Sequence, residues 1–396
     1  MASEPLYGQP PSRPAPWNDP KIRAIAFQVA VSLGVAAFLV YLVLNTLHNL
    51  EARGIASGFG FLSRPAGFGI AQSLIEYSEA STYGRTFAVG LLNTLLVSGL
   101  GIVLATVLGF VIGVARLSRN WLIGKLAAAY IEIFRNIPLL LQILFWYFAV
   151  FLALPEVGEA LKLGESIFLS RRGLYLPQPV LESGFSWTFA ALAAAIAAGV
   201  ALARWAHRRQ ELTGERFPAL LVSLALVLGL PALAFIASGR PLAWQLPEMG
   251  AFDFAGGFAV IPELAALLVA LVIYTAAFIA ETVRAGILAV AHGQTEAAYA
   301  LGLRPAWTTR LIIIPQAMRV IIPPLTSQYL NLIKNSSLAT AIGYPDLFAV
   351  FAGTTLNQTG QAVEVMAMTM AVYLLISLLI SFFMNWYNVK MALVER

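Results

Sequence analysis

Eight runs of mainly apolar residues alternate with more polar segments along the chain. The runs occupy about 23–46, 86–115, 126–154, 186–204, 217–238, 260–289, 317–343 and 362–387. A transmembrane helix needs roughly 20 consecutive apolar residues, and each run reaches or approaches that length. The pattern therefore predicts an all-α polytopic membrane protein with about eight transmembrane helices and both termini on one side.

The composition agrees with this prediction. Hydrophobic residues make up 59% of the 396 residues, charged residues make up 11%, and the mean hydropathy is +0.78. A soluble core could not bury that much apolar surface. Because the chain contains no cysteine, disulfides and thiolate metal sites are excluded. Residues 1–22 include many prolines, and we expect them to form a disordered cytoplasmic tail.

Lysine and arginine are distributed unevenly between the loops. With the N-terminus in the cytoplasm, the basic residues on that side are Arg13, Lys21, Arg23, Arg116, Arg119, Lys125, Arg204, Arg208, Arg209, Arg216, Arg304, Arg310, Arg319, Lys390 and Arg396. Those on the other side are Arg53, Arg64, Arg85, Lys162, Arg171, Arg172 and Arg240. Cytoplasmic loops carry the excess of basic residues in membrane proteins. The asymmetry predicts a cytoplasmic (inner) membrane protein with cytoplasmic N- and C-termini, and it explains the net charge of +5 without a nucleic-acid partner.

One segment, 291–315, is a polar, helix-forming loop between two apolar runs. It carries Glu296, Ala297, Ala298, Gly302, Ile312 and Pro315. The glutamate and the alanines favour a helix, whereas the glycine either ends it or lets another surface approach closely. We expect Pro315 to stop any continuation. The alternative is an ordinary interhelical loop, since Glu-Ala-Ala alone is common in helices, although the full spaced pattern is much rarer.

Few ionisable residues fall within or at the edges of the apolar runs. They are Glu132 and Arg135, Glu281 and Arg284, and Lys334. Charges at membrane depth need a partner, an aqueous cavity or a helix end. Each Glu-x-x-Arg spacing places opposite charges on one helix face, so the pairs either neutralise themselves or present an acid and a base to a zwitterion.

Two polar neighbourhoods interrupt the runs. Pro138 lies inside an apolar run, where it should kink a helix and free backbone carbonyls. Lys334, Asn335 and Ser336 follow Pro323-Pro324, which we expect to interrupt the next-to-last span. Polar, broken helices are tolerated where they are buried in protein or line an aqueous path. We interpret both neighbourhoods as pathway-lining, with helix–helix hydrogen bonding as the alternative.

These residues together resemble a known family. The Glu296–Pro315 spacing is similar to the EAA loop of bacterial ABC-importer permeases. Further motifs resemble the polar-amino-acid (histidine/glutamine) permease subfamily: Asn93-Thr94, Gly99 and Gly109, Glu132–Pro138, Tyr274–Gly286, Gly293-Gln294, Pro315–Arg319, Lys334–Leu338 and Asp346-Leu347. The added N-terminal run and the inserted pair 186–238 are similar to those of the general L-amino-acid permeases.

The resemblance implies a domain organisation. A type I ABC-importer permease core of about five helices would comprise 86–154 and 260–390, with the coupling loop 291–315 in the second part. Additions to the core would be a transmembrane helix at 23–46, an extracytoplasmic segment at 47–85, and an insertion at 155–259 that holds the helical hairpin 186–238.

The resemblance also implies a function. The chain would be the permease subunit of an ATP-driven importer of L-amino acids with broad specificity, in which Glu296, Ala297, Ala298, Gly302, Ile312 and Pro315 contact the ATPase. Glu132, Arg135, Glu281, Lys334, Asn335 and Ser336 would line the substrate pathway. Expected partners are a second homologous permease subunit, two ABC ATPase subunits, an extracytoplasmic amino-acid-binding protein and membrane lipid.

Other function classes are less well supported. The chain lacks the Walker A pattern, so we expect it to be non-catalytic, with no cofactor of its own and with ATP and magnesium on the partner ATPases. An intramembrane enzyme is disfavoured, since no zinc-protease or serine-hydrolase motif is present. An ion-coupled secondary amino-acid transporter remains the alternative, with Glu132, Glu281 and Lys334 as proton or ion carriers, although no inverted repeat is evident.

Overall fold

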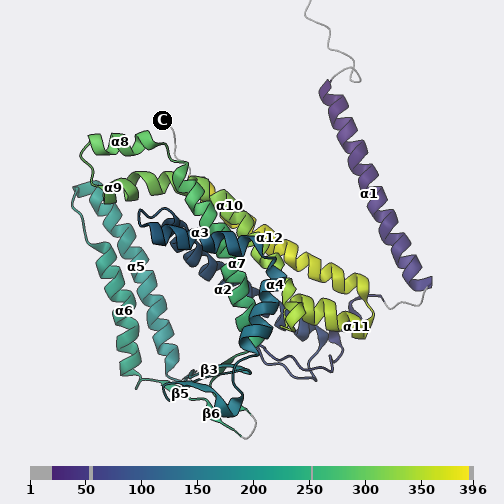
Figure 1. Cartoon of the computed structure of the whole chain (residues 1–396). Helices are drawn as coiled ribbons and strands as arrows, with labels where there is room; N and C mark the ends of the chain where they lie inside the picture. The colour runs from purple at the N-terminus through teal and green to yellow at the C-terminus, as the bar shows by residue number, and fades with distance from the viewer. Residues whose placement is uncertain (1–19, 53–56, 251–252, 392–396) are drawn as a thin grey trace, which may run out of the picture.

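The computed structural model describes residues 20–52, 57–250 and 253–391, and most of them are helical (Figure 1). Among these described residues, six helices are long and apolar enough to span a membrane: α1 (Pro20–Ala52), α2 (Tyr83–Arg116), α5 (Phe185–Thr213), α6 (Ala219–Ala237), α7 (Pro262–Leu288) and α12 (Ala362–Met391). Most of the tail predicted at 1–22 lies outside the described residues.

A seventh span is bent. α3 (Trp121–Asn136) is followed by α4 (Leu139–Leu144) and the π-helical η3 (Phe145–Phe151), and the helix axis bends by 104° between these two arms. Pro138 lies at the bend, which confirms the expected kink. Its ring has no N–H to donate to the carbonyl of Phe134. The Gln142 side-chain amide donates to that carbonyl and to the carbonyl of Ile137, at 3.0 Å in each case.

The predicted run 317–343 is helical over most of its length but differs from expectation. α10 (Ile314–Asn335) contains Gln316, Arg319 and Lys334, and it is not among the helices of the described chain that are apolar enough to span a membrane. The prediction that Pro315 stops the helix is wrong, because Pro315 lies in the first turn, where no N–H is needed. Pro323 and Pro324 also lie inside α10, and the α-helix changes to the 3₁₀-helical η6 (Ser336–Ile342) only after Asn335.

The core centres on α7, which packs closely on α2. Gly109 and Gly113 of α2 allow this approach, because a Cβ on Gly109 would lie 2.6 Å from the side chain of Ile279. A Cβ on Gly113 would lie 2.7 Å from the carbonyl oxygen of Ala280. Such close contact through small residues is a common way for membrane helices to associate. The central window of α7 is 61% buried, compared with 28% for α2.

The inserted helices α5 and α6 form an antiparallel hairpin that stands apart from the core (Figure 1). They pack on one another far more than on any other helix. The closest approach is at Gly199, where a Cβ would lie 3.3 Å from the Cβ of Ser223. Both helices fall within the segment 155–259 that was expected to be an insertion.

Short strands flank the hairpin, a feature that the all-α prediction did not include. β1 (Leu161–Leu163), β2 (Ile167–Ser170), β3 (Gly173–Leu176) and β8 (Phe258–Val260) form an antiparallel sheet in that order. β4 (Gln178–Leu181) pairs with β5 (Leu242–Gln245), and β6 (Glu248–Met249) pairs with β7 (Phe254–Ala255). Pairing of Leu181 with Leu242 holds the two ends of the helical hairpin together.

Asp253 organises the side chains beside this sheet. Its carboxylate accepts hydrogen bonds from the Tyr175 hydroxyl at 2.7 Å and from Arg172 at 2.9 Å. Partial burial of Asp253 opposes its ionisation. The two hydrogen bonds, a third from the Phe254 N–H and the positive charge of Arg172 favour ionisation more strongly, so the pKa of Asp253 lies below its usual value. Asp253 therefore stays ionised and links the segment before β7 to Arg172 and to Tyr175 of β3.

The remaining elements are short. They are η2 (Phe59–Ser63), η4 (Val157–Glu159), α8 (His292–Ala300), α9 (Pro305–Thr308), the π-helical η5 (Thr309–Ile313), the π-helical η7 (Phe348–Thr355) and α11 (Leu356–Thr359).

Candidate functional sites

The predicted coupling loop folds as a short helix on the surface. α8 carries Glu296, Ala297 and Ala298, and it lies at the end of the molecule opposite the β-strands (Figure 1). Only residues 289–291 separate α8 from α7. On its other side, α9 and η5 lead directly into α10, so α8 is joined to two long helices of the core.

Gly302 ends α8, as its sequence position suggested. Its φ of 75° lies in the left-handed region, which favours glycine. The Gly302 N–H donates to the carbonyl of Tyr299 at 2.9 Å, and the Leu303 N–H donates to the carbonyl of Ala298 at 3.1 Å. These two bonds form a Schellman motif, which satisfies the last carbonyls of the helix and reverses the chain.

The outer surface of α8 combines charge with apolar groups. Ala298 is buried against the protein, whereas Glu296 projects outward and pairs with Nδ1 of His292 at 3.0 Å. The nearby apolar side chains of Tyr299, Leu301 and Trp307 are 49%, 81% and 51% exposed. Ile312 and Pro315 are half-buried behind this surface. Exposed apolar groups beside a charge are typical of a protein-docking surface.

The two Glu-x-x-Arg pairs behave differently. Glu281 and Arg284 form a two-point ion pair at 2.7 and 3.0 Å, which agrees with local neutralisation. Glu132 and Arg135 form no ion pair within the described chain. Instead, the Arg135 guanidinium lies 5.1 Å from the centre of the Phe278 ring on α7.

The acid and the bases of these pairs are nevertheless neighbours. The Arg135 guanidinium of α3 lies over the ring of Phe278, three residues before Glu281 on α7, so the two charged side chains lie in the same region of the molecule. The structure therefore brings Arg135 and Glu281 together, whereas Lys334 belongs to a different region.

Lys334, Asn335 and Ser336 lie where α10 changes to η6. Ser336 is buried and donates to the carbonyl of Ile333 at 2.8 Å, while Ser337 donates to the carbonyl of Lys334 at 2.7 Å. Both serines thus satisfy backbone carbonyls at the helix change. Asn335 is half-buried.

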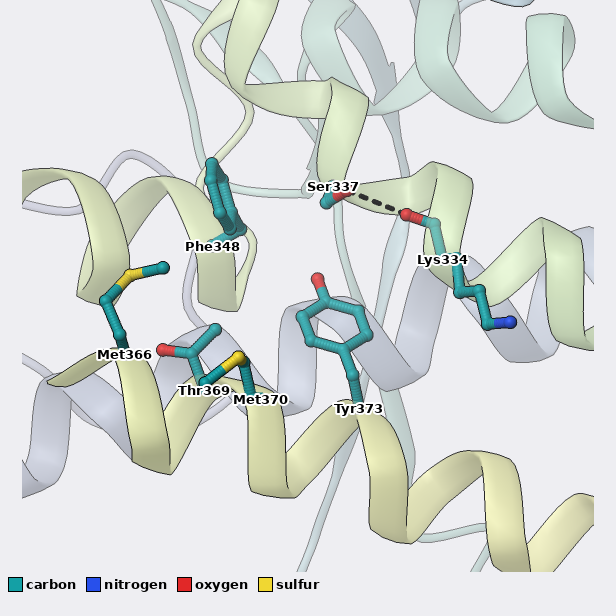
Figure 2. A pocket seen from close by; sticks show the side chains of 7 residues that line it. All are labelled: Lys334, Ser337, Phe348, Met366, Thr369, Met370 and Tyr373. Carbon is teal, nitrogen blue, oxygen red and sulfur yellow. Dashed lines mark hydrogen bonds between the residues drawn. The ribbon is translucent and has the colours of Figure 1, made fainter. Parts of the chain in front are cut away.

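A cavity of about 290 Å³ adjoins Lys334 (Figure 2). Its lining residues are Lys334, Ser337, Phe348, Met366, Thr369, Met370 and Tyr373. The Lys334 side chain extends away from Met366 and Met370, so the cavity is mainly apolar around the Tyr373 ring (Figure 2). The Lys334 ammonium makes no hydrogen bond or ion pair with any described residue.

A buried polar cluster behind this cavity was not identified as a site from the sequence. Asp346 is fully buried and accepts hydrogen bonds from the Tyr373 hydroxyl at 3.1 Å and the Ala349 N–H at 2.8 Å. Thr94 of α2 accepts from the Leu347 N–H at 3.0 Å, and the Asn93 side chain donates to the Pro345 carbonyl at 2.9 Å. In the sequence, the feature that could have indicated this cluster is Asp346, an acidic residue between the apolar runs 317–343 and 362–387.

The residues of these sites do not form a metal centre. Among residues 20–52, 57–250 and 253–391, no three His, Asp or Glu side chains gather closely enough to hold an ion.

Comparison with known proteins identifies the family. The family described as binding-protein-dependent transport system inner membrane component matches residues 196–392. The YhdX protein of Escherichia coli (strain K12) is 57% identical over 380 residues, which cover 96% of this chain and 97% of YhdX.

Two further relatives match along nearly their whole length. The general L-amino acid transport system permease protein AapQ of Rhizobium johnstonii is 52% identical, with coverage of 99% of this chain and 98% of AapQ. The glutamate/glutamine/aspartate/asparagine transport system permease protein BztB of Rhodobacter capsulatus is 45% identical, with coverage of 96% of each chain. On this evidence the chain belongs to the family of ABC-importer permeases for polar amino acids.

Proposed function

We propose that this chain is the membrane-spanning subunit of an ATP-driven importer that carries L-amino acids of several kinds into the cytoplasm. The observation that carries the proposal is the surface helix α8, which exposes Glu296 and several apolar side chains while remaining joined to α7 and α10. Such a helix can transmit a push from a soluble partner to the membrane core. The names of AapQ and BztB, which both refer to amino-acid transport, support the substrate class.

The proposed partners follow from this role. α8 would dock on one of two ABC ATPase subunits, which hold ATP and magnesium, and the chain itself would remain non-catalytic. A second, homologous permease subunit would complete the pathway, and an extracytoplasmic binding protein would deliver the amino acid. In this arrangement the N- and C-termini and α8 lie in the cytoplasm, and the β-strands lie outside.

The motion would be transmitted through short connections. Closure of the ATPases would displace α8, and residues 289–291 and η5 are too short to absorb a large displacement. α7 and α10 would therefore move with α8 and open the pathway to the outside, while hydrolysis would reset it.

The proposed pathway contains two polar regions. Glu132 and Arg135 lie on α3 and Glu281 lies on α7, and Lys334, Asn335 and Ser336 lie where α10 changes to η6. An amino acid carries a carboxylate and an ammonium group whatever its side chain, so fixed cations and anions along the path suit broad specificity.

Transport by the assembled complex in vesicles tests the function. Uptake of a labelled amino acid should require ATP on the cytoplasmic side and should continue when proton and sodium gradients are collapsed by ionophores. Uptake that follows an ion gradient and ignores ATP would instead support the ion-coupled secondary transporter, with Glu132, Glu281 and Lys334 as carriers.

A further inference from the structure

The inserted hairpin carries an apolar groove between α5 and α6 that no part of the proposed transport cycle uses. The groove has a volume of about 490 Å³ and is lined by Ile196, Val200 and Ala203 from α5 and by Ala219 and Leu220 from α6, among others. A volume of that size is typical of sites for small ligands. Contact between Gly199 and Ser223 forms part of its floor.

The groove opens to the surroundings of the protein. Ile196, Val200 and Leu220 are 50%, 45% and 81% exposed, and the hairpin stands apart from the core. Both helices are long and apolar enough to cross a membrane, so we expect lipid to surround the groove. A soluble partner could not reach these side chains.

Basic residues lie beyond one end of the groove, near the connection between α5 and α6. Ile196, Val200 and Arg204 follow one another at intervals of four, so Arg204 continues the groove face of α5, and Arg208 continues it by one more turn. Arg216 lies in the short loop between α5 and α6, three residues before the groove residue Ala219 with which α6 begins. This tip lies at the same end of the molecule as α8 (Figure 1).

None of these three arginines forms an ion pair with an acidic residue of the described chain. Of the two acidic residues of the tip, Glu215 pairs with Arg209 at 2.7 Å, and Glu211 lies 3.2 Å from Nδ1 of His207. The Arg209 guanidinium also lies 5.4 Å from the centre of the Trp205 ring. Arg204, Arg208 and Arg216 make no side-chain hydrogen bond, ion pair or ring contact with residues 20–52, 57–250 or 253–391.

We propose that the α5–α6 groove binds an anionic phospholipid, with an acyl chain against Val200, Ala203 and Leu220 and the phosphate at Arg204, Arg208 and Arg216. The groove spans roughly 10 Å of helix at about 1.5 Å per residue, which holds the upper part of an acyl chain. Guanidinium groups bind phosphate through paired hydrogen bonds, and arginines beside a membrane surface attract anionic lipids. An apolar groove with cations at one end matches an amphiphile of that charge.

The test measures lipid binding to the assembled complex by native mass spectrometry. Phosphatidylglycerol and phosphatidylcholine with identical acyl chains are added separately. We expect wild type to bind phosphatidylglycerol in preference, and R204Q/R208Q/R216Q to lose about fivefold in affinity for each arginine removed. Equal binding of both lipids by wild type would overturn the proposal.

Matched variants separate this site from general charge and from misfolding. R64Q/R119Q/R240Q removes three other exposed arginines and should retain binding, and R204K/R208K/R216K should retain most of it because the charge is kept. Equal loss in R64Q/R119Q/R240Q would contradict the site. Elution of each variant as an intact complex in size-exclusion chromatography is required for the comparison.

A third variant distinguishes a lipid from free phosphate. Ala203→Phe fills the groove but leaves all three arginines, so it should weaken phosphatidylglycerol binding at least severalfold while excess inorganic phosphate fails to displace the lipid from wild type. If Ala203→Phe binds as wild type does, or if inorganic phosphate displaces the lipid, the groove does not hold an acyl chain and the proposal is wrong. None of these measurements depends on transport, so they succeed or fail independently of the proposed function.

Discussion

Glu296 is the residue at which a change of charge should reveal the partner surface most directly. Because its side chain projects from α8 and contacts only His292 in the described chain, Glu296→Lys should leave folding and membrane insertion intact. Reversed charge in a close docking surface should abolish the ATP hydrolysis that substrate-loaded binding protein stimulates. Gly302→Asp should also lower stimulated hydrolysis, but by straining the end of α8, because a φ of 75° disfavours a side chain although no atom lies within 4 Å of a Cβ at that position.

Glu211 supplies a matched control for this prediction. It is exposed and pairs with His207 at the same i,i+4 spacing on α5. Glu211→Lys should therefore leave stimulated hydrolysis unchanged. Normal coupling in Glu296→Lys, or an equal loss in both variants, would remove the basis for the assignment.

Arg135 is the second residue with a measurable role. If its guanidinium receives the substrate carboxylate, Arg135→Lys and Arg135→Gln should raise the half-saturation concentration for every amino acid transported, with normal assembly. Uptake by reconstituted complexes would be measured for acidic, neutral and basic amino acids. The structure offers a competing role, because the guanidinium stacks on Phe278. Unchanged uptake, or a loss matched by poor assembly, would indicate that stacking alone matters; Arg119→Gln serves as the exposed control.

At the residue scale, the sequence predicted where helices end or bend better than it predicted which side chains contact each other. The end of α8 at Gly302 and the bend at Pro138 followed from backbone chemistry, which acts locally. The partner of Arg135 could not be predicted, because Phe278 is distant along the chain and meets it only through packing of α3 on α7. The Asp346 cluster was missed for the same reason, since Tyr373 and Thr94 come from different helices.

Among the elements, the contact between α2 and α7 should tolerate the least change. Gly109→Ala would place a Cβ 2.6 Å from Ile279, so the helices must separate. Overpacking of this kind costs about 1–3 kcal/mol, and thermal unfolding of the purified complex should shift downward by several degrees. Gly99→Ala on the same helix is the control, since nothing lies within 4 Å of its Cβ. That variant should be neutral or slightly stabilising, and equal shifts for the two would contradict this account.

The α5–α6 hairpin should be dispensable for substrate choice. β4 and β5 hold its ends together, so residues 184–239 can be replaced by an Asn-Gly turn without stretching the chain. We expect the deletion to reduce assembly or thermal stability while the set of transported amino acids stays the same. Competition uptake assays check this, and a well-assembled deletion variant with altered preference would contradict it.

Element types were predicted unevenly along the chain. Long apolar runs gave helices because a backbone in lipid must satisfy its hydrogen bonds internally. The strands at 161–181 and 242–260 are only two to four residues long, which is too short for an alternating pattern to indicate them, and two of the pairings, β3 with β8 and β4 with β5, join segments far apart in sequence. The prolines of α10 were misjudged because packing kept the helix intact where propensity favours a break.

For the whole molecule, the side of the membrane on which each end lies is an open prediction. The absence of cysteine allows a direct measurement, since a single introduced cysteine has no competitor. A membrane-impermeant maleimide should label Glu165→Cys in intact spheroplasts and should label Glu211→Cys only after permeabilisation. Labelling in the reverse order would invert the orientation and place α8 outside the cytoplasm.

The bend at Pro138, between α3 and α4, has a mechanical consequence for the whole molecule. A bend whose carbonyls are left open can be straightened or deepened by water, whereas here the amide of Gln142 spans the break and bonds to carbonyls on the far arm. These two hydrogen bonds oppose opening of the bend, so we expect the two arms to move together rather than about a hinge at Pro138. A displacement of α3 should therefore also displace α4 and η3. We expect the conformational change of a transport cycle to occur before Trp121 and after Phe151, where these two arms join the rest of the chain.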